Sequence, residues 1–404
     1  MGWLGLDDTD SLRGGCTTQV FHDLIEHLPS NVECGVPRLV RLWPFAKRRT
    51  RGNAALSIEI ISDDESELMR VLESFWNERI LPLKGDVLES DISPREQAPT
   101  SPGMVWFDQQ PDAAIYWAAV RGNVDLEDLP EATRSWGGYG RIGATAAVAW
   151  PAENVTWEAI AWRTYDAAGQ RRIDETTLSQ IDEWEDIVFS RDPRRGTGLI
   201  APRGHSPVLF GIRSLTKASA EIACQTLLAS EETEQHDGWR VFCTNQASGD
   251  HLQGNHRGQV TATALNAARK HVVISTETFS MISYAEGGEV NALARWLAVG
   301  DEIEARGLVH PNGSLHVEQL RVLNPVPRKQ RRPLCQTCGV RMKSMGSMQG
   351  LRCPTCKQRT DDTWVDVSES PPFDGWTEPP VDARRHLARP LAWSENSVND
   401  KKPT

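Results

Sequence analysis

The first thirty residues alternate between apolar and polar stretches in a way that predicts a buried strand followed by a helix. Residues 3–6 form a short apolar run that is typical of the end of a buried strand, and polar residues follow at once. Val20, Phe21, Leu24, Ile25 and Leu28 recur at helical spacing, so they share one face of a helix. The chain therefore opens as strand, polar loop and helix.

The middle of the chain repeats this alternation of strands and helices. Strands are expected at 157–163, 207–213 and 239–245, and helices at 173–184 and 215–230. The order β-α-β-α-β predicts a small α+β sandwich of ferredoxin type.

From residue 258 the pattern becomes all-β. Five strands are expected, at 258–265, 271–276, 301–309, 314–318 and 320–323, with a helix at 290–299. Five short strands with one helix before the later strands fit an OB-fold, which commonly holds single-stranded or looped nucleic acid. A structural barrel without a ligand is the alternative.

The loop between the first strand and the first helix gathers groups that bind a metal and a phosphate. In chain order it carries three carboxylates, a glycine turn and two hydroxyls: Asp7, Asp8, Asp10, Gly14, Gly15, Thr17 and Thr18. The free N–H groups of a helix N-terminus suit a phosphate. Carboxylates beside that phosphate would repel it unless a hard cation such as Mg²⁺ lay between them. The loop thus indicates a nucleotide–metal site, although it is not a Walker A motif, because Gly-Lys-Ser/Thr is absent.

Each of these signals also has a purely structural interpretation. An acidic loop after a strand can be a solvated turn, and Thr17 or Thr18 can be a helix N-cap. The basic loop Lys47, Arg48, Arg49 and Arg51 is either a solvated hairpin tip or a surface for nucleotide phosphates or an RNA backbone. The glycine-rich turn at 136–143 either contacts a ligand or lets a helix pack closely.

Two CxxC pairs are the most specific motif in the chain. Cys335 and Cys338 are separated by fourteen residues from Cys353 and Cys356. This spacing fits one tetrahedral Zn²⁺ in a zinc ribbon, and four cysteines leave no open coordination position for catalysis. We therefore expect a structural zinc, in a ribbon made basic by its lysines and arginines.

Composition narrows the remaining classes of protein. The 404 residues predict two to four domains, and the net charge of −11 argues against binding nucleic acid over the whole surface. No apolar run approaches the roughly 18 residues of a membrane span. The chain begins directly with a strand, so no signal peptide is expected, and the cysteine usage favours a reducing, cytoplasmic location.

Seven blocks spread along the chain resemble one archaeal enzyme family, the agmatinylcytidine synthetases of isoleucine tRNA (TiaS). The blocks are GLDDTDSLRGGCTT at 5–18, PRLVRLWP at 37–44, TRGNAAL at 50–56, PVLFGIR at 207–213, FCTNQASGDHL at 242–252, the two CxxC pairs and ARRHLARPL at 383–391. The resemblance implies an enzyme that uses ATP to attach agmatine to the 2-carbon of the wobble cytidine of a CAU-anticodon tRNA. In that family phosphorylation turns the 2-oxygen of cytidine into a good leaving group, which agmatine then displaces.

The resemblance also implies a multidomain α+β architecture. An atypical kinase-like domain at 1–140 would precede a ferredoxin-like domain at 141–255, an OB-fold at 256–326, a zinc ribbon at 327–362 and a C-terminal tail at 363–404. ATP, Mg²⁺ and Zn²⁺ would be the cofactors, with tRNA and agmatine as substrates. Neither a membrane nor an obligate protein partner is expected.

Site roles follow from the same resemblance. Asp7, Asp8 and Asp10 match the metal and catalytic carboxylates, and Thr17 matches an autophosphorylated threonine, with Thr18 beside it. The groups expected to bind ATP are Gly14, Gly15, Lys47, Arg48, Arg49, Arg51 and Asn53. Agmatine is a dication, and Asp250 with Asn245 and Gln246 is the segment expected to bind it.

Two other classes of protein stay open. A non-enzymatic RNA-binding protein could be built on the barrel and the ribbon, but it would leave the acidic loop without a role. An aspartyl-phosphate phosphohydrolase could use Asp8-Thr9-Asp10, which superficially resembles the Asp-x-Asp loop of that class.

Overall fold

The computed structural model describes residues 1–10, 15–48, 53–85, 98–192, 194, 196–202, 206–361, 363–367 and 369–393. The chain divides into two compact units. The first contains Met1–Gln253 together with the chain from Val381 onward, and the second contains Gly254–Pro380. The C-terminal segment therefore returns to the unit in which the chain begins.

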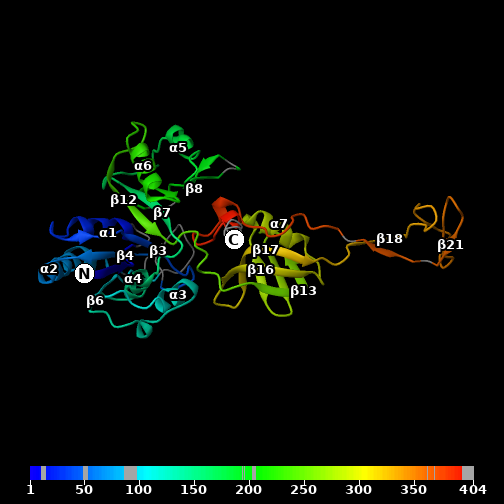
Figure 1. Ribbon diagram of the computed structural model, residues 1–404, viewed down its shortest axis with the longest axis horizontal. Coiled ribbons are helices and arrows are strands. Elements are labelled where there is room, and N and C mark those ends of the chain that lie inside the picture. Colours follow the sequence, from blue (N-terminus) through cyan, green and yellow to red (C-terminus); the bar gives the residue numbers. More distant parts are fainter. Residues whose placement is uncertain are drawn as a thin grey trace, which may run out of the picture. The chain divides into compact units, whose positions relative to one another are not determined.

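One ten-stranded sheet runs through the first unit (Figure 1). Its main path is β6-β5-β1-β4-β3-β12-β7-β11-β8, and β2 pairs with β4. The strands are β1 Gly2–Asp7, β2 Glu33–Cys34, β3 Arg38–Arg41, β4 Ala54–Ile61, β5 Gly103–Phe107, β6 Arg134–Gly137, β7 Thr156–Arg163, β8 Ile187–Val188, β11 Val208–Ser214 and β12 His236–Thr244. A separate hairpin joins β9 Arg191–Asp192 to β10 Thr197–Gly198.

The sheet has two halves, and they meet at its one parallel pairing among the described strands. Cys243 and Thr244 of β12 lie opposite Arg38 and Leu39 of β3, whereas the other strand pairs are antiparallel. Residues 2–137 build one half, and residues 156–244 build the other. Side chains from distant parts of the sequence therefore come together at this junction.

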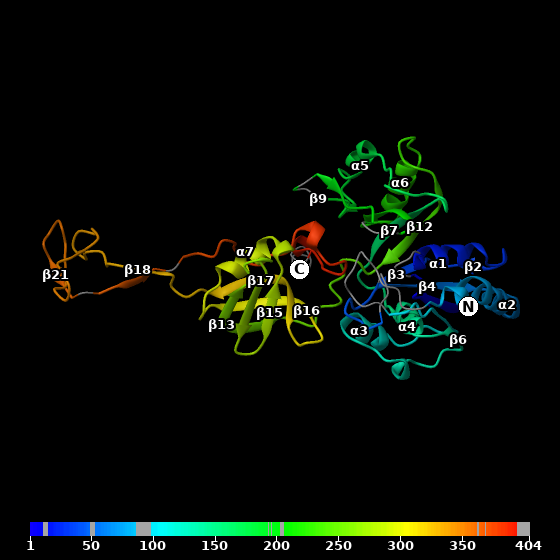
Figure 2. The ribbon, with the colours of Figure 1, turned by 180° about the vertical axis from the view of Figure 1, so that it is seen from behind.

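Helices cover both faces of the first half, as Figures 1 and 2 show for α1 and for α3 with α4. The helices of the unit are α1 Thr17–Glu26, α2 Glu65–Phe75, α3 Ala114–Arg121, α4 Gly140–Ala149, α5 Glu175–Ile181 and α6 Lys217–Leu228. The alternation in β1 explains this arrangement, since successive side chains point to opposite faces. Leu4 and Leu6 pack with the apolar faces of α1 and α2, while Trp3 packs with α4.

Shorter helical turns complete the first unit: η1 Trp76–Ile80, η2 Leu81–Leu83, η3 Leu126–Asp128 and η5 Val381–Ala383. In the second half, α5 and α6 pack on β7 and β11 around a core that contains Leu178, Phe210 and Leu227. The five predicted elements are present in the predicted order, but the short strands β8, β9 and β10, which were not predicted, lie between α5 and β11.

A closed five-stranded barrel in the order β13-β14-β15-β17-β16 forms the core of the second unit. Its elements are β13 His256–Leu265, β14 Val272–Thr276, β15 Ser280–Ser283, η4 Ala285–Gly287, α7 Glu289–Trp296, β16 Glu302–Val309 and β17 Leu315–Asn324. The prediction of separate strands at 314–318 and 320–323 is wrong, because both belong to β17. Gln319 does not break that strand, since its buried side chain accepts a hydrogen bond from Arg306 Nη1 at 3.1 Å.

The sequence reading also missed β15, which completes the five strands. It is only four residues long, and its two buried side chains, Met281 and Ser283, are a weak alternating signal.

The rest of the second unit holds the cysteine pairs. Short strands form two small sheets there: β18 Lys329–Arg331 with β22 Val365–Val367, and β19 Lys343–Ser344 with β20 Leu351–Arg352 and β21 Arg359–Thr360. The residues of the expected tail at 363–404 belong to three different parts of the structure. Its first residues form β22, Phe373 packs on the barrel core, and the chain from Val381 belongs to the first unit.

Candidate active site

A cavity of about 650 Å³ opens within the first unit. Both halves of the sheet contribute to its lining. Of the residues predicted from the sequence, the lining includes Asp7, Asp8, Asp10, Thr17, Thr18, Lys47, Arg48 and Asn53. The tertiary structure therefore gathers the acidic loop, the threonines and the described part of the basic loop around one space.

The acidic loop is held from the neighbouring chain segment. The Asp8 carboxylate accepts a hydrogen bond from the Ser101 N–H at 2.8 Å, and the Thr100 hydroxyl donates to the Asp10 carbonyl at 3.0 Å. Asp8 has a φ of 60°, which is uncommon outside glycine and marks a constrained turn. The first contact holds the Asp8 carboxylate, and the second holds the backbone at Asp10.

Asp7 lies against the first turn of α4. A Cβ added at Gly143 would come within 1.9 Å of Asp7 Oδ2, and one at Gly140 within 2.5 Å of the Asp7 carbonyl. The glycine-rich turn therefore allows close packing, and both glycines also line the cavity. The two interpretations offered for this turn are compatible.

The Asp7 carboxyl group is in an environment that disfavours its charge. Burial raises the pKa of Asp7 well above its ordinary value, and the nearby Asp8 and Asp10 carboxylates act in the same direction, against a backbone hydrogen bond at Asp8. A bound cation would reverse this balance and keep the group ionised. Three carboxylates therefore line one cavity, but among the described residues the four cysteines form the only group of three or more side chains placed to hold one metal ion.

The two threonines begin α1 and do not cap it. Cys16 occupies the N-cap position, so the interpretation of Thr17 or Thr18 as an N-cap is wrong. The Thr17 hydroxyl accepts a hydrogen bond from the Thr9 N–H at 3.4 Å, which places it beside the acidic loop. The Thr18 hydroxyl accepts from Trp162 Nε1 at 3.2 Å and lies 2.9 Å from Cys16 Sγ. Thr17 is therefore the hydroxyl tied directly to the carboxylate loop.

The basic loop is described only in part. The Arg48 guanidinium lies over the Tyr139 ring, 3.8 Å from its centroid, at the cavity wall. Asn53 donates from Nδ2 to the Leu42 carbonyl at 2.6 Å, and Gly15 adopts a φ of 78°. Gly14, Arg49 and Arg51, which we also predicted for this site, lie outside the described residues.

The segment predicted to bind agmatine lies behind the cavity wall. Asn245 is buried and bonds through its side chain to the backbone of Arg41, with distances of 2.7 and 2.9 Å. The Tyr116 hydroxyl donates to Asp250 at 2.5 Å and accepts from Asn245 at 3.0 Å. Among the described residues, the cavity lining does not include Asn245, Gln246 or Asp250. Direct contact of these residues with agmatine stays a prediction.

A polar cluster that the sequence analysis did not predict also lines the cavity. Glu158 of β7 is buried, and it pairs with Arg41 of β3 at 3.7 Å and with Arg213 of β11 at 3.3 Å. Gln246 connects the cluster to the C-terminal segment, since its Nε2 donates to Glu158 and its Oε1 lies 3.1 Å from His386 Nδ1. The signal was present in the sequence as charged residues inside otherwise apolar strands.

Two arginines and one carboxylate leave this cluster with an excess positive charge. The charge of Arg41 lowers the pKa of His386 well below its ordinary value, and desolvation and Arg213 add to the effect. Burial likewise lowers the pKa of Arg41, against the opposing effect of Glu158. The cavity lining therefore combines acidic groups at the end of β1 with a cationic cluster contributed by β3, β7 and β11.

The four predicted zinc ligands come together in the second unit. The sulfur atoms of Cys335, Cys338, Cys353 and Cys356 all lie within 4.8 Å of one another. Two backbone turns place them, with Gly339 N–H bonded to the Cys335 carbonyl at 2.8 Å and Lys357 N–H to the Cys353 carbonyl at 3.2 Å. Sulfur atoms about 2.3 Å from a tetrahedral Zn²⁺ would have this mutual spacing.

In the part of the chain that the structure describes, no helix is long and apolar enough to cross a membrane.

Three family models match the chain. The model described as the TiaS TCKD domain matches residues 3–138, the TiaS FLD domain matches residues 138–251, and the TiaS C-terminal zinc ribbon domain matches residues 332–367. The matches cover both halves of the large sheet and the cysteine cluster.

Similar proteins and structures extend over almost the whole chain. TiaS of Methanocorpusculum labreanum, a 2-agmatinylcytidine synthetase of isoleucine tRNA, is 30% identical over 436 residues, which is 98% of this chain and 97% of the relative. The crystal structure of a TiaS complex with isoleucine tRNA and ATP matches with a TM-score of 0.76 and 27% identity, over 97% of each chain. A TiaS complex with the same tRNA, AMPCPP and agmatine matches with a TM-score of 0.73 and 25% identity, over 97% of this chain and 96% of the other.

Proposed function

This chain belongs to the TiaS family, and we propose that it has the activity of that family. It is an ATP-dependent tRNA-modifying ligase that attaches agmatine to the 2-carbon of the wobble cytidine in the CAU-anticodon isoleucine tRNA. The product, 2-agmatinylcytidine, changes the decoded codon from AUG to AUA. The single observation that carries the proposal is the cavity, which joins three carboxylates and a helix-start threonine to a cationic cluster.

The chemistry needs an activated oxygen on the cytidine. The 2-oxygen is a poor leaving group, and a phosphoryl group from ATP makes it a good one. A guanidino nitrogen of agmatine then forms the new bond to the 2-carbon, the bond to the phosphorylated oxygen breaks, and phosphate departs. The nitrogen gives up one proton. Catalysis of this kind depends mainly on positioning and charge stabilisation.

The acidic groups of the cavity serve phosphoryl transfer. We assign Asp7 and Asp8 as ligands for Mg²⁺ and Asp10 as the third carboxylate that aligns the reacting groups. The ion, when bound, would neutralise charge on the phosphates. Thr17 is the assigned site of autophosphorylation, a transfer from ATP that releases the nucleoside diphosphate and is separate from phosphorylation of the cytidine. The Thr17 hydroxyl bonds to the backbone of the acidic loop, whereas that of Thr18 is held by Trp162.

The basic groups of the cavity bind the phosphate groups of ATP and of the RNA in this proposal. We assign Lys47 and Arg48 to ATP phosphates or to the RNA backbone, together with Gly14, Gly15, Arg49, Arg51 and Asn53. Arg41 and Arg213 carry the excess charge of the cluster around Glu158, and they face the same space. Guanidinium groups suit phosphate because of their planar, bidentate donors.

Agmatine brings two positive charges, whereas Glu158 already neutralises part of the charge of Arg41 and Arg213. We propose that the segment predicted from the sequence, with Asn245, Gln246 and Asp250, binds agmatine beside this cluster. Gln246 reaches Glu158 through its side-chain amide, and Asn245 and Asp250 are linked through Tyr116.

The second unit binds the tRNA in this proposal. Its barrel has the strand count and the helix placement of an OB-fold, and its cysteine cluster is a zinc ribbon. The first unit combines a kinase-like and a ferredoxin-like part, at about 1–140 and 141–255. Trp364 in the ribbon is exposed, with the Arg332 guanidinium 4.1 Å from its ring centroid, and this pair can stack on an unpaired base.

The direct test is incorporation of labelled agmatine into a tRNA transcript with a CAU anticodon, with and without ATP. The expected result is ATP-dependent labelling that disappears when the wobble cytidine is replaced by uridine. Absence of label with folded, zinc-replete protein would refute the proposed reaction. Labelling of the uridine variant would refute the assigned position.

A further inference from the structure

Part of the lining of the active-site cavity is apolar, in contrast to its carboxylates and arginines, and we call this part the apolar wall. It consists of Leu199, Ile200, Ala201 and Pro202, with Val208 beside them at the start of β11. Such a wall suits the flat face of a nucleobase, which packs against apolar or aromatic side chains when an enzyme takes the base out of its stack. The proposed reaction supplies two bases, the adenine of ATP and the cytosine of the anticodon.

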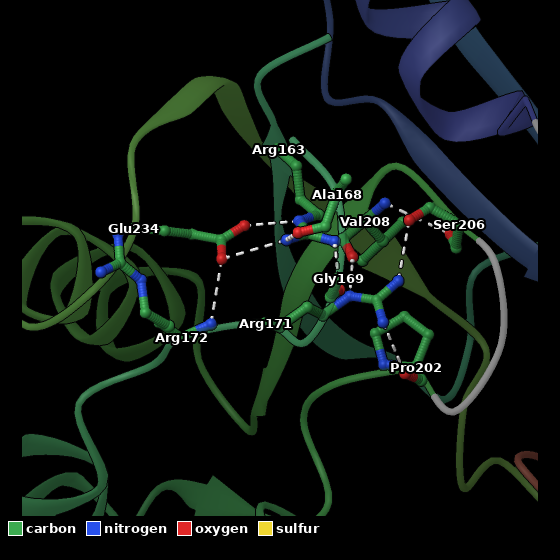
Figure 3. A network of polar contacts seen from close by, with 9 residues as sticks. All are labelled: Arg163, Ala168, Gly169, Arg171, Arg172, Pro202, Ser206, Val208 and Glu234. Atoms are coloured by element: carbon green, nitrogen blue, oxygen red, sulfur yellow. Dashed lines mark hydrogen bonds and ion pairs between the residues drawn. The ribbon is translucent and has the colours of Figure 1, made fainter. Parts of the chain in front are cut away.

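A single guanidinium group holds the chain that forms this wall. Arg171 donates from Nε to the Val208 carbonyl at 2.8 Å, from Nη1 to the Pro202 carbonyl at 3.0 Å and from Nη2 to the Ser206 carbonyl at 2.8 Å (Figure 3). All three nitrogens of one side chain thus bind carbonyls on both sides of residues 203–205. Only a planar group with several fixed donors can make this set of bonds.

The loop that carries Arg171 is itself fixed. Arg163 of β7 donates to the Gly169 carbonyl at 3.0 Å and to the Ala168 carbonyl at 3.3 Å, and it pairs with Glu234 at 2.5 Å (Figure 3). Both side chains of this pair are buried, with exposures of 9% each. We call the three hydrogen bonds of Arg171 to the wall segment the Arg171 clamp. Through Arg163 and Glu234, this clamp is connected to the interior of the sheet.

Glu234 is kept ionised in this network. Burial acts to raise its pKa, but hydrogen bonds from the Arg163 side chain and the Arg172 backbone outweigh burial, so the pKa of Glu234 lies below its ordinary value. The Arg172 N–H bonds to Glu234 at 3.0 Å, while the Arg172 side chain is exposed and points away from the wall in Figure 3. Two adjacent arginines thus differ in what their side chains do.

We propose that Arg171 is a positioning residue that holds the apolar wall at the place where the wall packs against a nucleobase. The proposal rests on the proposed function, which brings both bases to this cavity. Loss of the clamp removes three charge-assisted hydrogen bonds from the wall segment and leaves the carboxylates, threonines and cationic cluster in place. The consequence is a loss of affinity for one base-bearing ligand without a comparable loss in the chemical step.

Variants Arg171→Ala and Arg171→Lys test this inference, with Arg172→Ala as the matched control. Calorimetry of the full chain measures Kd for ATP and, separately, for a CAU anticodon stem–loop RNA. Kinetics give kcat and the KM for agmatine. We expect about a tenfold rise in Kd for one of the two ligands in Arg171→Ala. Arg171→Lys should recover only part of the affinity, and Arg172→Ala should match the wild type. The affected ligand identifies which base meets the wall.

A second variant tests the wall without touching the clamp. Ala201 is exposed at the wall, so Ala201→Gln should fold normally and weaken the same ligand. Unchanged Kd values for both ligands in Arg171→Ala and Ala201→Gln would overturn the proposal. An equal loss of both affinities, agmatine KM and kcat would also overturn it, because that result indicates general damage. If Arg171→Ala does not fold, Ala201→Gln decides alone. A wild-type protein that binds both ligands but makes no agmatine adduct would refute the reaction and leave this affinity test intact.

Discussion

The zinc cluster and the catalytic cavity are two sites built in opposite ways. The four cysteines lie between residues 335 and 356, and two local backbone turns bring their sulfur atoms together. The cavity combines residues from Asp7 to His386, and contacts such as that of Arg41 with Asn245 span 204 positions of the chain. A local site is readable from spacing alone, whereas a site at a strand junction exists only once the sheet is formed.

Cys353→Ser should have the largest effect and should be confined to the ribbon. Structural zinc contributes about 10–16 kcal/mol to the folding of small zinc domains, so losing one of four thiolates should release the metal and unfold the ribbon. We expect weaker tRNA binding and unchanged ATP binding, measured together with zinc content. The control is Cys34→Ser, at an exposed cysteine outside the cluster. Full tRNA affinity in the zinc-free variant would contradict the assigned role of the ribbon.

Asp8→Asn changes the cavity and should have the converse effect, a loss of turnover without a loss of tRNA binding. Asparagine tolerates the left-handed backbone at this position and can still accept the Ser101 N–H, so the fold should survive. Turnover should fall by about 10³-fold because the charge that holds the cation is lost, while tRNA binding persists. Asp63→Asn, at an exposed carboxylate, is the control. If tRNA binding disappeared together with turnover, the division of labour between the two units would be wrong.

Glu158→Gln should destabilise the junction of the two sheet halves. The variant leaves Arg41 and Arg213 half-buried without their shared carboxylate, and breaking a buried ion pair of this kind costs about 3 kcal/mol. Denaturant unfolding followed by tryptophan fluorescence measures the loss, with Glu231→Gln in an exposed loop as the control. The agmatine KM should rise at the same time. Wild-type stability and wild-type KM together would show that Glu158 has neither role.

His386 gives the smallest effect, and it depends on pH. Because the pKa of this group is lowered in the folded protein, the unfolded chain binds more protons as pH falls below the ordinary value of 6.5. Its contribution to stability is therefore fully present above pH 6.5 and is lost as pH falls toward the folded pKa. His386→Asn should show a shallower loss of stability between pH 7 and pH 5 than the wild type. Parallel stability curves for the two proteins would contradict this assignment.

Prediction from sequence succeeded where the signal is local and periodic. The first helix, the elements of the β-α-β-α-β order and the cysteine cluster all follow from spacing. The prediction failed where a buried polar group is satisfied by a distant partner. Gln319 was predicted to separate two strands, but it lies within one strand and bonds to Arg306. Thr17 or Thr18 was considered as a helix N-cap, but Cys16 occupies that position.

The residues of the candidate site also fall into two groups, those predicted from a local signal and those that were not predicted. The acidic loop, the threonines and the basic loop were named from the sequence, since each is a short run of one chemical type. Arg41, Glu158 and Arg213 were not, because each lies in a mostly apolar strand, outside any run of groups of one chemical type. Asn245 and Asp250 were predicted to bind a ligand because their side chains are an amide and a carboxylate. In the structure these side chains bond to Tyr116 and to the backbone of Arg41.

Residue spacing and periodicity act over a few turns of chain, so they were enough to predict most elements, the zinc ligands and the types of chemical group at the end of the first strand. The pairing of β3 with β12, which joins the two half-sheets, could not be predicted because it depends on contacts between residues about 200 positions apart. This junction brings the acidic loop and the arginine cluster into the lining of one cavity, together with the apolar segment that Arg171 contacts.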